Sequence, residues 1–407
     1  MKKKKAVTVV SLFSGAGGMD LGFINAGFEI VWANDFFKEA VETYKKNISD
    51  HIILGDITKI KSSEIPNEVD LVIGGFPCQG FSVANTKRSM KDSRNFLYRE
   101  MLRIIEDKKP KFFVAENVKG LMSMEKGKVL EMIKADFESI GYKVEARLLN
   151  AAEYGVPQQR ERVVLIGNRL GVENPFPKVT HWVDSKRYTT RKGLKKAVSV
   201  KQVIGHLSDV RLSDYPIQLA DETLYNHVAS TNVFDTFWGR KYKVNQHDIC
   251  DYLKEWRSKS GYTTKKVDDH FGYKHTAGHW FRKDNNSGSI PKPSDWWELK
   301  KILDFDDKYD KKVTTIVEKE IKFEQSLRIT NWDRPSDTIT ATGPEIHVNK
   351  ERRLSVRECA IIQTFPNDFE FVGSLNIMYK QIGNAVPVLL AEKIAKEIYD
   401  ILKESSN

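Results

Sequence analysis

Residues 8–18 read TVVSLFSGAGG, a run of β-branched and apolar residues that passes directly into a glycine-rich turn. Such a run is typical of a buried strand, and the glycines after it let the backbone lie close against a ligand. A stretch of helical length begins at Gly18. This strand, loop and helix predict the start of an α/β domain that binds a nucleoside-containing cofactor, although the loop lacks the full G-x-G-x-x-G spacing of a dinucleotide site.

The same alternation of short apolar runs and amphipathic stretches continues to residue 167. It predicts strands at 8–13, 29–33, 51–54, 69–73, 111–115, 146–149 and 163–166, and helices at 18–26, 37–47, 95–107 and 128–140. Apolar residues at helical spacing over 386–403 predict a last helix that docks back on this domain. Apolar strands that alternate with helices indicate a mostly parallel sheet with helices on both faces.

Length and composition exclude several classes of protein. The 407 residues predict two or three domains, and 40% hydrophobic with 29% charged residues is globular composition. No apolar run approaches the roughly 18 residues of a membrane span. The basic residues 2–5 and the short apolar run after them predict a solvated tip and a buried strand, not a signal peptide. Three cysteines, Cys78, Cys250 and Cys359, give no disulfide framework, which favours a reducing cytoplasm.

Basic charge is concentrated in the middle of the chain. Residues 168–337 hold 31 Lys and Arg against 24 Asp and Glu, which is +7 of the net charge of +10. The same residues hold seven of the eight Trp and seven of the nine His, and 186–201 contain seven basic residues and no acidic one. This pattern favours a nucleic-acid surface, and a solvated basic face with scattered core tryptophans is the alternative.

Residues 248–307 have the pattern of several short helices. Helices are predicted at 251–259, from Thr263 to Gly272, at 275–282 and at 293–303. The glycine turn between the second and third resembles a helix-turn-helix, and an ordinary helical insertion explains the pattern equally well. His275 and His279 could bind a metal with His270, but no carboxylate or cysteine pair lies at close spacing, and we expect no metal site.

Groups with catalytic potential follow or precede three of the predicted strands. Cys78 lies in the loop after 69–73, Glu116 ends the strand at 111–115, and Arg160 and Arg162 enter the strand at 163–166. Open α/β sheets bind ligands at the carboxyl ends of their strands, and alternation places the two arginines on one face. Cys78 taken alone would be interpreted as a buried structural cysteine. Together, a thiol, a carboxyl group and two guanidiniums can hold an electron-poor ring and its developing charge.

The chain resembles the DNA (cytosine-5)-methyltransferase family, which depends on S-adenosylmethionine. Its blocks stand in the family's order: FSGAGG at 13–18, GDI at 55–57, FPCQ at 76–79, ENV at 116–118, QQRER at 158–162, RECA at 357–360 with FP at 365–366, and QIGNAVP at 381–387. The resemblance covers both ends of the chain and leaves about 170–337 unassigned. It implies a Rossmann-like methyltransferase sheet with an inserted, smaller target-recognition domain.

The resemblance implies a role for each reactive group. Cys78 is implied as the nucleophile that adds to C6 of a cytosine, so that C5 takes the methyl group from the sulfonium. Glu116 would hold or protonate N3 with a pKa raised by burial, Arg162 would contact the exocyclic oxygen, and Arg160 would lie beside the thiolate. A duplex encloses these ring atoms, so the cytosine must be flipped out of the stack.

The resemblance also implies a cofactor site. Phe13 would lie against the adenine, Gly15 and Gly17 against the methionine part, and Asp35, usually Glu in the family, would take the ribose hydroxyls. Ser11 stands where many members carry an acid, which makes the amino-acid end of this site less certain. The other implied cofactor residues are Phe36, Asp56, Ile57, Pro77, Leu97 and Asn384.

Domain boundaries and DNA contacts follow from the same resemblance. Residues 1–169 would form the catalytic and cofactor-binding domain, completed by 377–407, and 170–376 the target-recognition domain, with the possible helix-turn-helix at about 248–307. The polar loop 82–95 matches the family's loop that closes over DNA. The implied DNA-binding residues are Gln79, Ser82, Lys87, Arg88 and Arg94.

We therefore predict a cytosine-5 DNA methyltransferase that forms the modification half of a restriction–modification pair. We expect a cytoplasmic monomer with double-stranded DNA as its partner, and a cognate endonuclease that acts on the same site without needing to bind. An RNA cytosine-5 methyltransferase is one alternative, disfavoured by the long basic insertion. A catalytically silent DNA-binding regulator is another, disfavoured by Cys78, Glu116 and both arginines. A nicotinamide dehydrogenase explains none of the blocks after Gly75.

Overall fold

The computed structural model of the chain describes residues 6–77, 97–183, 192–231, 246–272, 280–281, 290–314, 328–341, 344–349 and 351–404. The chain divides into two compact units. The first comprises Met1–His227, Asp333–Ala341 and Val356–Asn407, and the second comprises Val228–Trp332 and Thr342–Ser355.

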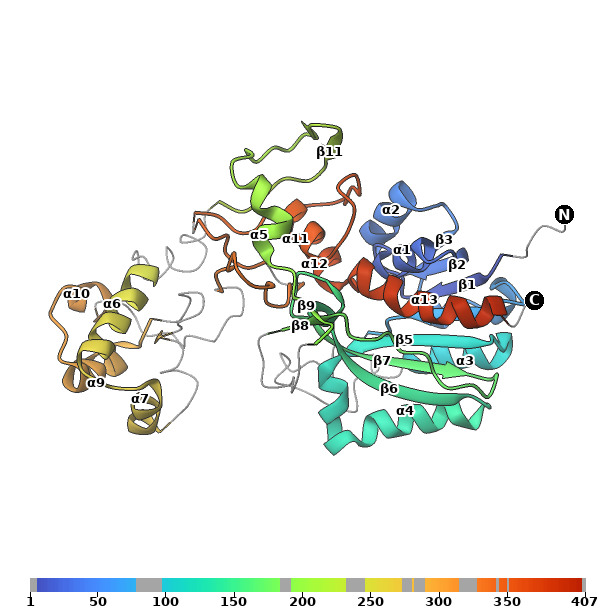
Figure 1. The fold of residues 1–407 in the computed structure, drawn as a ribbon, viewed down its shortest axis with the longest axis horizontal. Helices are drawn as coiled ribbons and strands as arrows, with labels where there is room; N and C mark the ends of the chain where they lie inside the picture. Colours follow the sequence, from blue (N-terminus) through green and yellow to red (C-terminus); the bar gives the residue numbers. More distant parts are fainter. Residues whose placement is uncertain are drawn as a thin grey trace. The chain divides into compact units, whose positions relative to one another are not determined.

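The first unit is built on a seven-stranded sheet (Figure 1), with strand order β3-β2-β1-β4-β5-β7-β6. The strands are β1 (Thr8–Leu12), β2 (Glu29–Asp35), β3 (Ile52–Leu54), β4 (Leu71–Gly74), β5 (Phe112–Val118), β6 (Lys143–Asn150) and β7 (Glu161–Asn168). From β3 to β5 every neighbouring pair is parallel, whereas β7 is antiparallel to both β5 and β6. The predicted mostly parallel α/β sheet is confirmed.

Helices cover both faces of this sheet, as the alternating pattern predicts (Figure 1). One face packs against α1 (Gly18–Asn25), α2 (Lys38–Asn47) and α13 (Val388–Glu404), and the other against α3 (Tyr98–Lys108) and α4 (Lys128–Ser139). On β1, Val9 belongs to the first apolar core, while Val10 and Leu12 belong to the second. The predicted final helix is α13, and it packs along α1, where Ala391 lies close to Gly22.

The antiparallel course of β7 follows from the length of its connection to β6. Only ten residues, 151–160, join the two strands, and a short 3-10 turn, η5 (Ala151–Tyr154), fills part of them. A parallel crossover needs a dozen or more residues, usually with a helix, so the chain folds straight back. The amino end of β7 therefore lies beside the carboxyl end of β5, and Arg162 is paired with Val118.

Smaller elements complete the first unit. They are η1 (Ile57–Lys59), η2 (Ser62–Glu64), η4 (Lys119–Gly127), β8 (His181–Trp182), β9 (Lys195–Lys196), α5 (Val200–Ile204), η6 (Gly205–Leu207), β10 (Ile217–Leu219), β11 (Glu222–Leu224), α11 (Val356–Ile362) and α12 (Leu375–Asn384). β8 and β9 pair in parallel, and β10 and β11 form an antiparallel hairpin.

The described part of the second unit between residues 246 and 314 is mainly helical. Its helices are α6 (Gln246–Lys259), α7 (Thr264–Phe271), α9 (Pro293–Leu303) and α10 (Asp310–Thr314). Trp280 and Trp296 are fully buried in its apolar core, together with Leu253, Val267 and Leu299. The predicted helices at 251–259, 263–272 and 293–303 are confirmed. The third predicted helix, 275–282, lies outside the described residues except for two positions, so the helix-turn-helix stays a prediction.

Candidate active site

The carboxyl edge of the sheet brings together groups that are far apart in sequence. The parallel strands β1, β2, β4 and β5 end there, and the antiparallel β7 begins there. The glycine loop 13–18, Asp35, the segment 75–77 and Glu116 follow or end these strands. This is the edge at which open α/β sheets bind their ligands.

Glu116 and Arg162 form an ion pair at this edge. Arg162 Nε lies 2.8 Å from Glu116 Oε1, and each side chain is 12% exposed. The register explains the pair, because Arg162 stands opposite Val118 and therefore shares a sheet face with Glu116, two residues earlier on β5. The Arg162 Nη1 also donates to the Glu161 carbonyl at 2.8 Å, which holds the guanidinium in place.

Burial controls the charge of Glu116. Burial raises the pKa of Glu116, and the cations of Arg162 and then Arg160 oppose that rise. A carboxyl group with a raised pKa is suited to hold or donate a proton near neutral pH. The rise has the predicted direction, and the role of Glu116 at a ring nitrogen stays a prediction.

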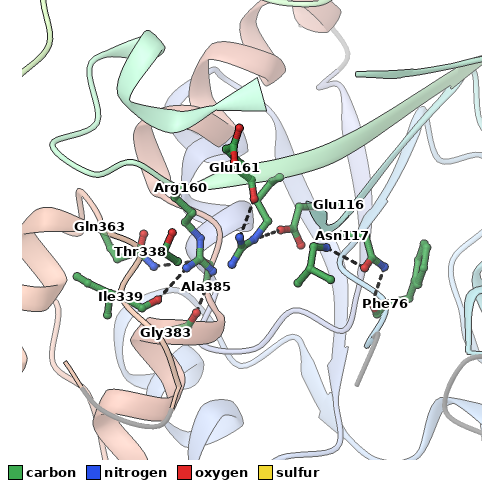
Figure 2. A network of polar contacts seen from close by, with 12 residues as sticks. Phe76, Glu116, Asn117, Arg160, Glu161, Thr338, Ile339, Gln363, Gly383 and Ala385 are labelled. Atoms are coloured by element: carbon green, nitrogen blue, oxygen red, sulfur yellow. Dashed lines mark hydrogen bonds and ion pairs between the residues drawn. The ribbon is translucent and has the colours of Figure 1, made fainter. Parts of the chain in front are cut away.

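Asn117 holds the loop that leads to Cys78. Its Nδ2 donates to the Phe76 carbonyl at 3.1 Å, and its Oδ1 accepts from the Val118 backbone N–H at 2.8 Å (Figure 2). Gly75 faces Glu116, and a Cβ at this glycine would lie 3.1 Å from Glu116 Oε2. The loop therefore leaves β4 directly beside the carboxylate. Cys78 itself lies outside the described residues.

Two glycines of the loop lie against neighbouring parts of the chain. Gly17 has φ +90°, and a Cβ there would lie 2.3 Å from Ile48 Cδ1. A Cβ on Gly18 would lie 2.6 Å from the Val386 carbonyl oxygen, so the segment after α12 packs against the loop. Gly15 has φ +56° with no atom within 4 Å of an ideal Cβ, so open space lies beside it.

Asp35 supports this loop from β2. Its Oδ2 accepts a hydrogen bond from the Gly15 N–H at 2.8 Å, and its Oδ1 accepts from the Phe37 N–H at 2.8 Å. Burial raises the pKa of Asp35, and these backbone donors oppose the rise. The next residue, Phe36, is 70% exposed, which leaves an aromatic face available beside the carboxylate.

The other implied cofactor residues lie at strand and helix ends. Phe13 has φ +55° and packs on the core beneath the sheet, and the Asp56 side chain accepts from Thr58 N at 3.0 Å at the start of η1. Ile57 is buried, Pro77 and Leu97 are half-buried, and Asn384 is exposed at the end of α12. The open space at Gly15 and the exposed Phe36 ring are compatible with an adenosine site among these side chains.

Arg160 lies one residue before β7 and is 1% exposed. Its Nη1 donates to the Ile339 carbonyl at 3.0 Å and its Nη2 to the Gly383 carbonyl at 2.8 Å (Figure 2). Both terminal nitrogens are thus engaged by backbone oxygens from distant segments. Sequence alternation correctly puts Arg160 near Arg162, but gives no indication of these carbonyl partners.

Sequence reasoning missed two buried polar groups near the site. Gln158 donates through Nε2 to Gln363 Oε1 at 2.9 Å, and its Oε1 accepts from the Ile339 N–H at 3.0 Å. Asp20 is fully buried in α1 and its Oδ1 accepts from Ser11 Oγ at 2.7 Å. An aspartate in the first turn of an otherwise apolar helix was the available signal for the second group.

The predicted DNA-binding residues Gln79, Ser82, Lys87, Arg88 and Arg94 lie outside the described residues, as do His275 and His279. Among the residues described, no three His, Cys, Asp or Glu side chains gather to hold a metal ion. None of the described helices has the length and apolar character that crossing a membrane requires. Lys195, Lys196 and Lys201 are exposed on the first unit.

Comparisons with known proteins agree on one family. The sequence profile of the C-5 cytosine-specific DNA methylases matches residues 7–400. The chain is 34% identical over 406 residues to the type II methyltransferase M.NgoFVII of Neisseria gonorrhoeae, covering 98% of this chain and 87% of that protein. It is 35% identical over 439 residues to the type II methyltransferase M.BspRI of Lysinibacillus sphaericus, covering 97% and 82%.

Two solved structures share the fold. One is of a protein assigned as a DNA modification methyltransferase encoded within a prophage of E. coli, with TM-score 0.60, 21% identity and coverage of 98% of this chain and 100% of that one. The other is the Entamoeba histolytica methyltransferase EhMeth, with TM-score 0.54, 15% identity and coverage of 98% and 99%.

Proposed function

Because the chain belongs to the C-5 cytosine-specific DNA methylase family, we propose that it transfers a methyl group from S-adenosylmethionine to C5 of a flipped-out cytosine in a specific duplex sequence. The family prediction made from the sequence blocks is confirmed. The chain is a cytosine-5 DNA methyltransferase of the restriction–modification type. The observation that supports methyl transfer to C5 of a flipped-out cytosine is the Arg162–Glu116 pair, which lies beside the loop that leads to Cys78.

We propose the cofactor site from the groups at the carboxyl edge. Phe13, Gly15 and Gly17 would line it, with Asp35 towards the ribose, and Phe36, Asp56, Ile57, Pro77, Leu97 and Asn384 around the adenosine. The open space at Gly15 supports this assignment, because a ligand can lie directly against the loop backbone there. When bound, S-adenosylmethionine supplies an electrophilic methyl group on a sulfonium.

In the proposed mechanism the Cys78 thiolate adds to C6 of the cytosine and forms a C–S bond. Glu116 holds or protonates N3, which takes up the electron density that this addition places on the ring. C5 would then be nucleophilic enough to take the methyl group, and the cofactor sulfur would keep the bonding electron pair as a neutral thioether. Transfer of the C5 proton to a base, with return of the N3 proton to Glu116, then allows β-elimination, which breaks the C–S bond and returns Cys78 as a thiolate. Arg162 contacts the exocyclic oxygen while its ion pair with Glu116 keeps both groups aimed at the ring.

We propose that residues 170–376 carry target recognition and that Gln79, Ser82, Lys87, Arg88 and Arg94 contact DNA. The exposed Lys195 and Lys196 support a polyanionic partner on this part of the chain. Modification of a specific site would protect host DNA from a cognate endonuclease, which need not bind the methyltransferase. We propose that the enzyme acts in the cytoplasm as a monomer.

The test supplies labelled S-adenosylmethionine with mixed-sequence duplex DNA and, separately, with tRNA. We expect label in duplex DNA only, and bisulfite sequencing to place it on one cytosine of one short sequence. Transfer to tRNA alone would refute the DNA substrate, and duplex binding without transfer would identify a silent regulator. Cys78→Ser is the matched variant. Methylation at the wild-type rate in this variant would show that the reaction does not need the covalent adduct between Cys78 and C6.

A further inference from the structure

The chain passes between its two units four times, at 227/228, 332/333, 341/342 and 355/356. The short segment Asp333–Ala341 belongs to the first unit but has the second unit on both sides of it in the sequence. The way this segment is anchored therefore determines where two of the four connections leave the first unit.

A buried polar junction anchors this segment to the start of β7. The backbone of Gln159 donates to the Ser336 carbonyl at 2.8 Å, and Thr338 Oγ1 donates to the Gln159 carbonyl at 2.8 Å. Gln158 Oε1 accepts from the Ile339 N–H, and Arg160 Nη1 donates to the Ile339 carbonyl. Both polar groups of the Ile339 backbone are thus held by side chains that directly precede β7.

The same arginine reaches a third piece of chain. Arg160 Nη2 donates to the Gly383 carbonyl, and Gly383 packs so closely on the segment that a Cβ would lie 2.3 Å from the Thr340 carbonyl carbon. Asn384, the proposed cofactor residue, comes next. Arg160 therefore joins β7, the connecting segment and the end of α12 at one point (Figure 2).

A second buried arginine has a comparable structural position without the catalytic neighbours. Arg357 is fully buried and donates to the backbone carbonyls of Tyr225, Pro366 and Phe369, next to the connections at 227/228 and 355/356. Its electrostatic partner is Asp368. The Arg160 cation, in contrast, lowers the pKa of Glu116, and the Arg162 cation lowers the pKa of Arg160. The two arginines share burial and carbonyl partners and differ in their link to the active site.

We propose that Arg160 is a positioning residue that holds the segment connecting the two units in register with the Glu116–Arg162 pair and with Asn384. Turnover and cofactor binding then both depend on where this segment lies. The inference rests on the proposed function, because it takes Glu116 and Arg162 as the base site and Asn384 as part of the cofactor site. It replaces the implied role of Arg160 beside the thiolate, since Ile339 and Gly383 already engage both terminal nitrogens.

The experiment compares four variants of the full chain. Arg160→Lys keeps the charge and loses the planar fork, Arg160→Met loses both, and Thr338→Val removes only the hydroxyl that donates to Gln159. Arg357→Lys is the matched control for the loss of a buried arginine. Each is assayed for kcat, for the KM of S-adenosylmethionine, for its melting temperature and for the pH midpoint of Cys78 alkylation by iodoacetamide. Cys250 and Cys359 are buried, and burial raises the pKa of Cys250 to about 12, so peptide mass spectrometry can follow Cys78 separately.

We expect Arg160→Lys to lower kcat about 10- to 100-fold and to raise the cofactor KM about 10-fold, because small displacements of reacting groups are costly. Thr338→Val should change both in the same direction by a smaller factor. Arg357→Lys should lower the melting temperature while leaving kcat within about 2-fold. The alkylation midpoint should stay unchanged in every variant.

Two results would overturn the proposal. One is wild-type kcat and cofactor KM in Arg160→Lys. The other is a raised pH midpoint of Cys78 alkylation in Arg160→Met with an unchanged cofactor KM. That result would support the role that the resemblance implies, with Arg160 beside the Cys78 thiolate. If Arg160→Met does not fold, the alkylation midpoint is read in Arg160→Gln, which also removes the charge. Failure of the proposed function is a separate result, because the wild-type chain would then transfer no methyl group to duplex DNA.

Discussion

The Arg162 guanidinium and the Glu116 carboxylate face each other across two antiparallel strands, with Nε and Oε1 2.8 Å apart. Removing two charges from water is costly, and the pair offsets part of this cost by mutual attraction and by a hydrogen bond from Arg162 to the Glu161 carbonyl. Burial nevertheless raises the pKa of Glu116. The buried carboxylate is therefore held between two opposing effects, the cost of burial and the attraction of the Arg162 cation.

Glu116→Gln should abolish most of the methyl transfer while keeping the fold. The amide has nearly the same shape but cannot exchange a proton with N3, so we expect kcat to fall by about 10²- to 10⁴-fold. Steady-state transfer to duplex DNA measures the change. Glu161→Gln is the control, because Glu161 forms a more exposed ion pair with Lys119 and should retain nearly full activity. Equal losses in the two variants would contradict the role of Glu116.

Asp35→Ala should weaken cofactor binding more than it slows turnover. The substitution removes the acceptor of the Gly15 and Phe37 N–H groups as well as the proposed partner of the ribose hydroxyls. Loss of a buried charged acceptor corresponds to about 10- to 100-fold in affinity, which isothermal titration with S-adenosylmethionine can measure. Glu42→Gln on the exposed face of α2 is the control. An unchanged affinity of Asp35→Ala for S-adenosylmethionine would show that Asp35 does not bind the cofactor.

Gly383→Ala should destabilise the first unit by about 1–3 kcal/mol, because its Cβ would overlap the backbone between Thr340 and Ala341. These are backbone atoms, which cannot rotate away as the end of a flexible side chain can. Urea unfolding gives the change in free energy. Gly205→Ala is the control, because its nearest atom is the flexible Lys201 Cγ at 3.3 Å, and it should be neutral or slightly stabilising.

Asp20→Asn should stabilise the protein above pH 6 and have little effect near pH 4. Burial raises the pKa of Asp20 to about 6, while the Ser11 and Tyr44 hydroxyls oppose the rise and Asp35 adds to it. A raised folded-state pKa means that the stabilising contribution is complete below the unfolded value and is lost as pH rises through about 6. At pH 8 the neutral amide avoids an ionisation cost on the order of 1–3 kcal/mol.

Thermal or urea unfolding of Asp20→Asn at pH 4 and pH 8 measures this difference. Asp50→Asn is the matched control, because Asp50 is exposed and its substitution should change the free energy of unfolding little at either pH. A destabilisation of Asp20→Asn that is the same at both pH values would show that the lost hydrogen bond from Ser11 decides the effect.

The pair Lys195→Ala and Lys196→Ala should weaken duplex binding without changing the recognised sequence. Both lysines are exposed on β9, and removing a cation that neutralises one phosphate should reduce the slope of log affinity against log salt by about 0.9. Fluorescence anisotropy at several salt concentrations, with specific and non-specific duplexes, measures both quantities. Lys396→Ala on the exposed face of α13 is the control. A change in specificity without a change in slope would contradict a phosphate role.

Most of the fold could be predicted because its signals are local. The strand at residues 8–12, the glycine loop and α1 follow from composition over fewer than 20 residues, and the same holds for α13 at the other end of the chain. The antiparallel turn of β7 was not predicted, since strand direction depends on connection length and on the neighbouring strand rather than on periodicity. The helices around Trp296 were predicted, but Trp280 and Trp296 are buried, as in the alternative interpretation of core tryptophans, and not on a nucleic-acid surface.

For the site, sequence alone identified the residue types and their positions at strand ends. The ordered blocks from Phe13 to Asn384 were sufficient for the family, because each block is short, specific and read locally. Tertiary structure alone decided the partners of those residues. Arg162 meets Glu116 only because β7 returns antiparallel, and Arg160 donates to carbonyls 179 and 223 residues away in the sequence. The physical reason is that side-chain periodicity is set over a few residues, whereas hydrogen-bond partners between distant segments are selected by how the whole core packs.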